Sequence, residues 1–432
     1  MNHIASPWSC VRHTRCRVCQ GELSEVFGLG PMWISQFPEM LKVMHHSDPN
    51  SAMLDTRDPK VPLNVAECMS CGLAQLTHTV PRDVLYRQYW YHSGLNPAME
   101  AQLLHIVQCA RQLVTVSSRD SVLDIGANDG TLLKHWHDDA ISLNNPHRIG
   151  VDPAVNLQGE LAKHAEMLLP DYWPLKVYDG PLCKAISSIA MFYDLEDPNA
   201  FVREVRRVLH PEGVWCVQFT DLVSMLRANA FDNIVHEHLE YYRLYDLVRL
   251  FKVYDLSVCK LERNDTNGGS LRLWVKHGSQ VGEPPVELIN ALGEEESYLQ
   301  HSHGWLGLAA RVAKQREAMN SLMDQAQDIA IYGASTKGNT LLQHYGIGDA
   351  SHPWVACTAV ERSSEKFGKF TVTGVPIVPE TWARKYFPEG GLVLVGPWHF
   401  KQGIIEREKG KWAKGVRFVF PLPEVEVVEM DV

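Results

Sequence analysis

The sequence predicts an α/β protein with a small cysteine-bearing N-terminal module, a central Rossmann-like domain and a C-terminal Rossmann-like α/β domain. Three observations predict this architecture: two Cys-x-x-Cys pairs, strand and helix patterns that alternate after them, and a second strand–turn–helix pattern that opens at Asp328. Alternating buried strands and helices are typical of a doubly wound parallel sheet. A chain of 432 residues is also too long for one compact core. We therefore expect domains at residues 1–84, 85–285 and 286–432.

Four cysteines define the N-terminal module, as the pairs Cys16 with Cys19 and Cys68 with Cys71. A polar or glycine turn follows each pair, so backbone amides can approach the sulfur atoms. In a reducing compartment, paired Cys-x-x-Cys motifs are more often zinc ligands than disulfides, with free thiols or a redox pair as the alternative. Four thiolates close a tetrahedral shell, so we expect a structural zinc with no open position for a substrate.

Composition argues against several classes of function. The chain has 41 basic and 51 acidic residues and a net charge of −10, which is not typical of a general nucleic-acid or membrane-surface binder. No apolar run approaches the roughly 18 residues of a membrane span, and the stretch MNHIASPWSC has no apolar signal core. We therefore expect a cytoplasmic protein with neither a nucleic acid nor a membrane as partner.

The central and C-terminal blocks follow from short apolar runs, which indicate strands, and from helical spacing of apolar residues between them. The expected elements, in chain order, are a helix at 103–114, a strand at 122–125, a glycine turn and helix at 126–136, a strand at 147–152, a buried strand at 186–192, a helix at 201–213, a strand at 214–220, a helix-rich linker at about 287–327, and a strand, turn and helix at 328–347.

The glycine turn after the first central strand indicates a nucleoside cofactor. Asp124, Gly126 and Gly130 have the D-x-G-x-x-x-G spacing of S-adenosylmethionine methyltransferases, not the G-x-G-x-x-G spacing of dinucleotide enzymes. Such a turn lets a ligand approach and points amide donors at it. Asp152 ends the next strand, where its carboxylate can accept hydrogen bonds from both ribose hydroxyls. With Asn128 in the turn, these residues form the predicted cofactor site; the alternative is that the glycines serve only the turn.

The stretch NIVHEHLEYY, residues 233–242, gathers two histidines, two glutamates and two tyrosines. Its H-E-H motif is not the H-E-x-x-H motif of zinc enzymes, and a helix would point the two histidines about 200° apart. On a strand, by contrast, His236 and His238 share one face. A metal site, a catalytic acid–base cluster and a polar strand end remain as alternatives.

Together and in this order, these motifs resemble those of the deoxysugar C-methyltransferases, which methylate C3 of nucleotide-linked 4-keto-6-deoxyhexoses with S-adenosylmethionine. The resemblance covers nearly the whole chain and includes NGGSLRLWV, YGASTKGNTLL, WHF and PLP. It implies a zinc-binding domain at 1–84, a methyltransferase domain at 85–285, and a helical linker with a domain that helps hold the nucleotide-sugar at 286–432. It also implies that the substrate lies between the second and third domains.

The resemblance extends to the segment that closes over the cofactor, with Tyr89, Tyr91 and Ser93 at the matching positions of Y-x-Y-x-S-G. The alternative for the two tyrosines is a half-buried place at a domain joint.

Methylation of carbon requires an enolate, because a C–H bond is not a nucleophile, so the site needs a base of near-neutral pKa and donors toward the C4 oxygen. Histidine suits the base. Guided by the resemblance, we assign His238 as general base, while Glu237 orients it or a substrate hydroxyl. His236 is assigned to polarise the C4 oxygen and Tyr242 to donate to the ketone. No metal is needed for this route.

The C-terminal strand–turn–helix has the spacing G-x-x-x-x-G-N, which is not a P-loop because no Lys-Ser/Thr follows the second glycine. Its amides, hydroxyls and lysine can contact a diphosphate, although Lys337 can instead be a solvated lysine at the start of a helix and Trp398 a core residue. The predicted substrate contacts are Asn267, Gly269, Ser270, Gly333, Ser335, Lys337, Glu361, Trp398 and His399. The partner expected is a dTDP-, GDP- or CDP-linked 4-keto-deoxyhexose; the oligomeric state is left open.

The chain departs from the family pattern at three places. Val235 stands where many members carry a tyrosine, Phe192 or Tyr193 stands where many carry a histidine, and Glu361 replaces a more usual aspartate. A tyrosine at 193, 241 or 242 can take over the missing function. The competing functions are an O- or N-methyltransferase acting on another acceptor, and a zinc-knuckle RNA-binding adaptor that resembles a methyltransferase.

Overall fold

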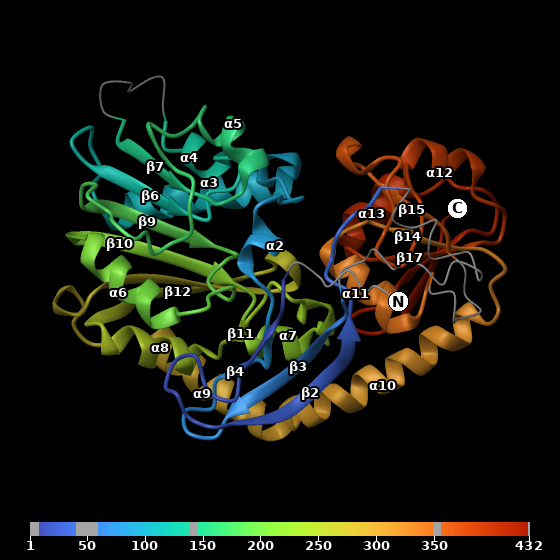
Figure 1. The fold of residues 1–432 in the computed structure, drawn as a ribbon, viewed down its shortest axis with the longest axis horizontal. Helices are drawn as coiled ribbons and strands as arrows, with labels where there is room; N and C mark the ends of the chain where they lie inside the picture. The colour runs from blue at the N-terminus through green and yellow to red at the C-terminus, as the bar shows by residue number, and fades with distance from the viewer. Residues whose placement is uncertain (1–7, 40–58, 138–144, 349–355, 431–432) are drawn as a thin grey trace.

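The computed structural model describes residues 8–39, 59–137, 145–348 and 356–430. The first seven residues, in which we expect no signal core, and part of the loop between the two cysteine pairs lie outside the described residues. Figure 1 shows two large α/β units with the N-terminal strands and the helical linker beneath and between them. Within the described residues, no helix has both the length and the apolar character needed to cross a membrane.

The N-terminal module is built on a four-stranded antiparallel sheet of order β11-β4-β3-β2. Its strands are β2 (Leu23–Met32), β3 (Val61–Cys68), β4 (Ala74–Leu76) and β11 (Glu240–Tyr241), and a second pair joins β1 (Val11–Arg12) to β5 (His78–Thr79). The strand β11 comes from the middle of the chain, so the module is completed by residues that we assigned to the central domain.

The central sheet has seven strands in the order β12-β13-β10-β9-β6-β7-β8. They are β6 (Ser121–Ile125), β7 (His147–Val151), β8 (Met167–Leu169), β9 (Cys183–Ile189), β10 (Leu209–Phe219), β12 (Leu256–Asn264) and β13 (Ser270–His277). Five strands run parallel as predicted, but β13 is antiparallel to both neighbours. The connection from β12 to β13 is a short turn, and a short turn can join only antiparallel strands.

Helices cover both faces of the central sheet (Figure 1). They are α3 (Pro97–Leu113), α4 (Thr131–Lys134), α5 (Gln158–Leu161), α6 (Pro198–Val208), α7 (Leu222–Arg227) and α8 (Leu244–Val253), and α2 (Arg82–Tyr86) precedes them. Helix α6 begins where the Asp197 side chain accepts a hydrogen bond from Ala200 N at 2.9 Å. It ends at Val208, five residues before the predicted end, because Leu209 already pairs with Cys183 in the sheet.

The linker consists of α9 (Val286–Ser302) and α10 (Gly304–Met323), and α10 runs along β2 to the C-terminal domain (Figure 1). That domain has a sheet of order β16-β15-β14-β17-β18-β19, parallel except for its last strand. Its strands are β14 (Ile329–Tyr332), β15 (Ala356–Glu361), β16 (Ile377–Pro379), β17 (Leu392–Val395), β18 (Arg417–Phe420) and β19 (Glu426–Glu429). Its helices are α11 (Thr336–Tyr345), α12 (Glu380–Tyr386) and α13 (Lys401–Glu408).

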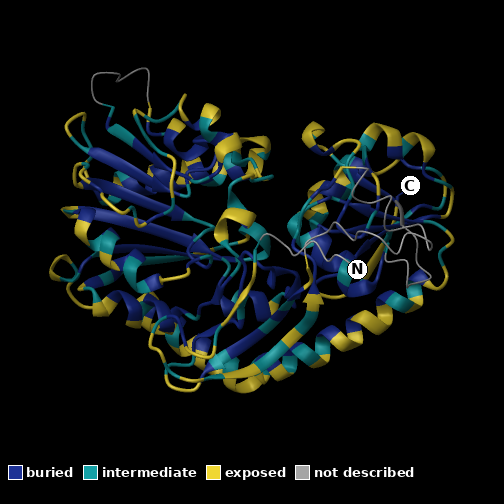
Figure 2. Ribbon diagram, viewed as in Figure 1, coloured by how far each residue is buried: buried dark blue, intermediate teal, exposed yellow. Residues whose placement is uncertain are grey.

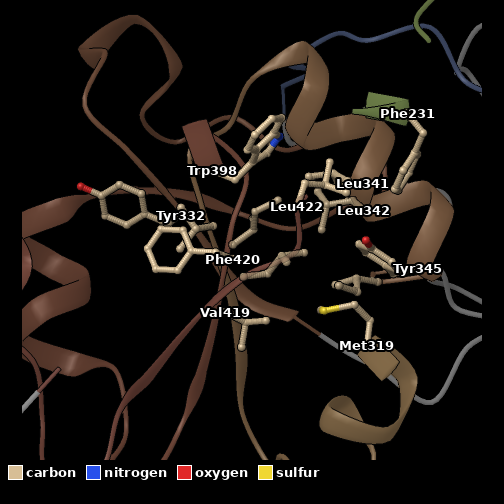
Figure 3. Close-up of a cluster of buried hydrophobic side chains, with 14 of the residues drawn as sticks. Phe231, Met319, Tyr332, Leu341, Leu342, Tyr345, Trp398, Val419, Phe420 and Leu422 are labelled. Carbon is tan, nitrogen blue, oxygen red and sulfur yellow. The ribbon is translucent and has the colours of Figure 1, made fainter. Parts of the chain in front are cut away.

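One hydrophobic cluster joins the N-terminal sheet, α10 and the C-terminal domain, and contains Leu63, Leu226, Val312 and Leu394. The inner strands of both large sheets are buried, whereas the edge strand β19 and the outer side of α10 are largely exposed (Figure 2). Figure 3 shows part of this cluster, in which Met319 of α10 packs with strand and helix side chains of the C-terminal domain. The shared apolar core therefore ties the domains together around the cavity described next.

Candidate active site

A cavity of about 610 Å³ lies at the carboxyl ends of the central parallel strands and faces helix α11 of the C-terminal domain. The carboxyl ends of β6, β7 and β9 supply one side, the segment at residues 82–99 covers a second, and Ser335–Lys337 belongs to the opposite side. Ligands of open α/β sheets bind at this end of the strands. The cavity is therefore the candidate active site.

The glycine turn after β6 has the backbone geometry that its sequence predicts. Gly126 has φ of 75° and Gly130 has φ of 81°, and Asn128 between them has φ of 53°. A Cβ on Gly126 would lie 2.9 Å from Cγ of Met191, so a side chain there would also clash. Gly126 and Asn128 line the cavity, but Gly130 does not. The role of Gly130 is thus to form the turn and begin α4 rather than to contact a ligand.

Two carboxylates stand beside this turn. Asp152 accepts hydrogen bonds from Asn128 N and Ala154 N, each at 2.8 Å, and Asp124 accepts one from Ser187 Oγ at 2.6 Å. Burial raises the pKa of Asp152 to about 6 and that of Asp124 to about 7. Each oxygen of Asp152 keeps a further acceptor site. Asp152 lines the cavity and can therefore receive ribose hydroxyls, as predicted from its place at the end of β7.

The segment Y-x-Y-x-S-G lies directly over the turn. Asn128 Nδ2 donates to Tyr91 O at 3.0 Å, and its Oδ1 accepts from Ser93 N at 3.0 Å. Gly94 N donates to Asp129 Oδ2 at 2.8 Å. Tyr89, Tyr91 and Ser93 all line the cavity. The side chain of Asn128 therefore holds the covering segment in place, a function that its sequence position alone did not indicate.

Affinity for S-adenosylmethionine is expected to fall as the pH drops through about 6, the pKa of Asp152, because the protonated acid loses acceptor capacity. Asp152→Asn is expected to weaken binding about 10- to 100-fold at pH 8 and to remove this step. Calorimetric titration from pH 5 to pH 8 measures both effects. Glu160→Gln, on the exposed side of α5, is the control and should match the wild type. An unchanged pH dependence in Asp152→Asn would contradict the ribose assignment.

The H-E-H motif lies in a turn between η4 (Phe231–Asn233) and β11, so it does not have the strand conformation in which His236 and His238 would share one face. His238 Nδ1 is 2.8 Å from Asn233 O. A carbonyl oxygen only accepts, so Nδ1 carries the hydrogen and Nε2 keeps a lone pair. Burial and the nearby Lys337 lower the pKa of His238 to about 3. The imidazole that lines the cavity is therefore neutral and keeps a lone pair at Nε2, but a pKa of about 3 lies below the near-neutral value expected of a general base. An anion bound beside Lys337 would raise this pKa by offsetting the charge of the lysine.

Glu237 also lines the cavity. Its Oε1 accepts from Thr336 Oγ1 at 3.5 Å, while its Oε2 is buried and has no hydrogen-bond partner in the described part of the chain. Burial raises the pKa of Glu237 to about 7. Near neutral pH this carboxyl group is thus present in both forms, so that it can donate a hydrogen bond to a ligand or accept one.

Two predicted catalytic residues lie outside the cavity, and their assignments are wrong. His236 turns to the N-terminal module, where its Nε2 contacts Val61 O at 3.0 Å. The ring of Tyr242 packs against Phe192, with a centroid distance of 5.4 Å, in the core of the central domain. Because the motif is a turn, neighbouring side chains point in different directions, and His236 does not share a face with His238.

Tyr193 occupies the place for which Tyr242 was proposed. It lines the cavity, and its ring centroid lies 4.0 Å from that of His238. From the sequence, Tyr193, Tyr241 and Tyr242 were the three tyrosines that could replace the missing catalytic group, and only the packing distinguishes them. Tyr241 lies in the shared core, where its ring centroid is 5.8 Å from that of Trp305.

Lys337 lies on the C-terminal side of the cavity. Its Nζ is buried and has no hydrogen-bond partner among the described residues. Burial lowers its pKa, and the negative charge of Asp232 opposes that shift. Ser335 begins α11 and accepts from Gly338 N at 3.0 Å. The alternative of a solvated lysine at the start of a helix is therefore wrong, and the unpaired cation faces a space that can hold an anion.

The remaining predicted substrate contacts divide into two groups. Asn267, Ser335 and His399 line the cavity, as does Lys337. The others do not: Gly269, Ser270, Gly333, Glu361 and Trp398. Trp398 Nε1 donates to Asp232 Oδ2 at 2.8 Å, and its ring is buried in the C-terminal core (Figure 3).

The four further residues outside the cavity have structural contacts that explain their positions. Ser270 Oγ donates to Thr266 O at 2.9 Å, and Glu361 Oε2 accepts from Lys366 Nζ at 3.3 Å. Gly269 and Gly333 have φ of 122° and 92°, which a side chain rarely adopts. This geometry does not support the predicted direct contact of these four residues with the substrate.

Sequence reasoning missed several charged cavity residues, among them Asp194 and Lys366. Asp194 follows β9, and burial with the neighbouring Glu237 and Glu240 raises its pKa well above the usual range. Its place after a buried strand was a usable signal, because ligands gather at strand ends. Lys366 donates to Ala334 O at 2.7 Å and also lines the cavity. Its surroundings in the sequence, SSEKFG, are those of an ordinary solvated loop and gave no signal.

The four cysteines of the N-terminal pairs meet in one cluster. Their Sγ atoms all lie within 4.8 Å of one another, with Cys16 to Cys71 at 3.7 Å and Cys19 to Cys68 at 3.4 Å. Tetrahedral zinc with Zn–S bonds of about 2.3 Å separates its sulfur ligands by about 3.8 Å. Val18 N approaches Cys16 Sγ and Ser70 N approaches Cys68 Sγ, each at 3.4 Å. The donor set fits a closed structural site, and none of its members lines the cavity.

Comparison with known proteins accounts for both large domains. Residues 99–261 match a family model described as a methyltransferase domain, and residues 265–423 match one described as a C-methyltransferase C-terminal domain. The chain is 27% identical to the C-methyltransferase NovU of Streptomyces niveus over 384 residues. These aligned residues cover 86% of this chain and 88% of NovU. The chain belongs to the S-adenosylmethionine-dependent C-methyltransferases. This confirms the family that the sequence motifs indicated, and the α/β architecture confirms the predicted fold class.

Solved methyltransferase structures resemble parts of this C-methyltransferase more distantly. The CcbJ methyltransferase from Streptomyces caelestis is 12% identical with a TM-score of 0.34, covering 44% of this chain and 93% of CcbJ. Magnesium protoporphyrin IX methyltransferase (ChlM) from Synechocystis PCC 6803, with bound S-adenosylmethionine, is 11% identical with a TM-score of 0.30, covering 41% and 77%.

Proposed function

We propose that this C-methyltransferase methylates C3 of a nucleotide-linked 4-keto-6-deoxyhexose through an enolate. The observation that carries the proposal is the neutral imidazole of His238. His238 lines a cavity that also contains the glycine turn and Asp152 on one side and Lys337 on the other, and its Nδ1 is held by Asn233 O, which leaves the lone pair on Nε2. A C–H acceptor cannot react until a base removes its proton, and a 4-ketone makes the C3 hydrogen acidic.

Different residues of the cavity have different roles in the proposed reaction. His238 Nε2 removes the C3 proton, and the electron pair moves onto the C4 oxygen. Tyr193 and the protonated form of Glu237 donate hydrogen bonds to that oxygen or to a sugar hydroxyl. When bound, S-adenosylmethionine supplies an electrophilic methyl group as a sulfonium. Asp152, the glycine turn and the segment with Tyr89 and Tyr91 are the groups that hold it.

The same arrangement suggests how the rest of the substrate is anchored. Helix α11 presents its amino end and the unpaired Lys337 to the cavity, and both features favour a phosphate or diphosphate. Asn267 and His399 lie on the same side and are available to the sugar or the nucleotide. The nucleotide remains one of dTDP, GDP and CDP. We further propose that the four-cysteine cluster binds a structural zinc and that the protein acts in branched deoxysugar biosynthesis in the cytoplasm.

Incubation of the purified protein with S-adenosylmethionine and a panel of dTDP-, GDP- and CDP-linked 4-ketohexoses tests this function. Mass spectrometry is expected to show a gain of one methyl group, located on carbon by NMR, with at least one member of the panel. The corresponding 4-hydroxy sugars are the matched controls and should gain nothing. No product with any ketosugar would overturn the proposal.

Exchange of the C3 hydrogen with deuterated water separates this reaction from O- or N-methylation. In the presence of S-adenosylhomocysteine, the enzyme is expected to exchange the C3 hydrogen without transferring a methyl group. An oxygen- or nitrogen-directed enzyme needs no enolate and would leave this hydrogen in place. Tight RNA binding at physiological salt would instead favour the adaptor function, although the net charge of −10 opposes it.

A further inference from the structure

The segment that carries His238 is held by the N-terminal module as well as by the central domain. Leu76 N donates to Leu239 O at 2.9 Å, and Glu240 in β11 pairs with Gln75 in β4. On the other side, the amides of Leu239 and Glu240 donate to Tyr193 O at 2.6 and 3.0 Å. The backbone immediately after the proposed base is therefore held between a strand of the cysteine-bearing module and the loop that follows β9.

Arg17 connects this segment to the first cysteine pair, because it lies between Cys16 and Cys19 in the sequence. Its Nη1 donates to Leu76 O at 3.0 Å and to Leu239 O at 3.5 Å. Its Nε lies 3.7 Å from Glu240 Oε1, and the two side chains are 3% and 0% exposed. Burial raises the pKa of Glu240 well above its usual range, and the charge of Arg17 opposes that shift. Removing either buried group leaves the other without its neighbour, which is costly, so this contact and the hydrogen bonds of Arg17 fix the relative position of the two segments.

Arg243 makes the corresponding connection from the second cysteine pair. Its Nη2 donates to Cys71 O at 2.9 Å, and Asp246 holds the same guanidinium at 2.7 Å. Gly72 leaves room for it, since a Cβ there would lie 2.4 Å from Nη2. Both cysteine pairs are thus joined by an arginine to the segment between His238 and Asp246.

We propose that Arg17 is a positioning residue that transmits the fixed geometry of the four-cysteine cluster to His238. The N-terminal module would then take part in catalysis without contacting the substrate, by holding the backbone of residues 239–240 where β11 begins. A displacement of the base by about 1 Å can lower a rate about 100-fold. This inference rests on the proposed role of His238 as general base.

Arg17→Met tests the proposal, with Arg15→Met as the matched control. Arg15 lies in the same cysteine loop, but its ion pair with Glu22, at 3.6 Å, is exposed. Arg17→Met is expected to lower kcat about 10- to 100-fold, with the KM for the ketosugar and the Kd for S-adenosylmethionine changed less than about threefold. Arg15→Met should leave all three unchanged. Equal kcat values for Arg17→Met and the wild type would overturn the proposal.

Amide hydrogen exchange measured by mass spectrometry gives a second reading that does not depend on the substrate. Faster exchange is expected at residues 235–241 in Arg17→Met, with no change at the glycine turn around Gly126. Zinc content, measured in the same samples, should equal that of the wild type. Unchanged exchange would overturn the positioning role even if no ketosugar is methylated, whereas faster exchange in an enzyme inactive toward the whole panel would contradict only the proposed function.

Arg17→Met leaves the carboxyl group of Glu240 buried without its partner and can therefore fail to fold. The double variant Arg17→Met/Glu240→Gln removes both charges and is expected to fold, since a neutral pair does not leave an isolated buried charge. It should show the same reduction in kcat and the same faster exchange. A folded double variant with wild-type kcat and exchange would overturn the proposal.

Discussion

His238→Ala is expected to lower kcat for methyl transfer about 1,000-fold and to abolish exchange of the C3 hydrogen in deuterated water. The reason is specific to one atom: Nδ1 is occupied by Asn233 O at 2.8 Å, so only Nε2 can take the proton. The affinity for S-adenosylmethionine should change little, because the glycine turn and Asp152 are on a different side of the cavity. Single-turnover kinetics measure the rate of methyl transfer, and uptake of deuterium measures the exchange of the C3 hydrogen. Calorimetry measures the affinity for S-adenosylmethionine.

The neighbouring histidine supplies the control for this experiment. His236→Gln keeps an amide donor for Val61 O, which His236 Nε2 contacts at 3.0 Å outside the cavity. Its kcat is expected to remain within about threefold of the wild type, as for a substitution that leaves the reacting groups in place. Wild-type turnover in His238→Ala, or loss of turnover confined to His236→Gln, would show that the base has been assigned to the wrong residue.

Removal of the proposed zinc is expected to have the largest effect on stability. Structural zinc in small domains provides about 10–16 kcal/mol of apparent binding free energy, which becomes folding free energy where no site exists in the unfolded chain. Cys68→Ser, or exhaustive chelation, should therefore lower the first thermal transition by about 10 °C or more. The purified wild type should contain about one zinc per chain and the variant about none.

Cys10→Ser is the control for the zinc experiment, because Cys10 is exposed and is not part of the four-cysteine cluster. It should retain the metal and the thermal transition of the wild type. If Cys68→Ser kept both, the cluster would be a group of free thiols, which the sequence left open as the alternative. Burial raises the pKa of Cys68, but hydrogen bonds from Cys71 N and Ser70 N, with those of the neighbouring thiols, lower it to about 7.

Features that depend on a few neighbouring residues could be predicted from the sequence. The Cys-x-x-Cys pairs had to form tight turns, and Gly126 had to adopt the positive φ of 75° that brings backbone close to a ligand. Asp152 follows a strand of five residues, and the end of a parallel strand faces the ligand in this class of fold. The α/β architecture followed from the same local alternation, except for the antiparallel edge.

Features that depend on the direction of a side chain in an irregular segment could not be predicted. His236 and His238 would share one face on a strand, but the backbone turns here, so that Glu237 and His238 line the cavity and His236 does not. Tyr193 and Tyr242 are equally plausible donors in the sequence, and the aromatic core around Phe192 takes Tyr242. Trp398 was assigned to the substrate because of its position after a strand, yet Asp232 and the C-terminal core hold it.

The sequence by itself indicated the fold class, the two Cys-x-x-Cys pairs, the glycine turn and the methyltransferase family, because these depend on residue spacing within short segments and on the order of those segments along the chain. Only the tertiary structure decided which residues surround the cavity. Lys337 has a buried Nζ without a hydrogen-bond partner in the described ranges, and the tautomer of His238 is set by Asn233 O. Both properties come from groups distant in the chain or from a turn that propensities do not specify. The connection of Arg17 to Glu240, across 223 residues, likewise exists only once β4 and β11 have paired.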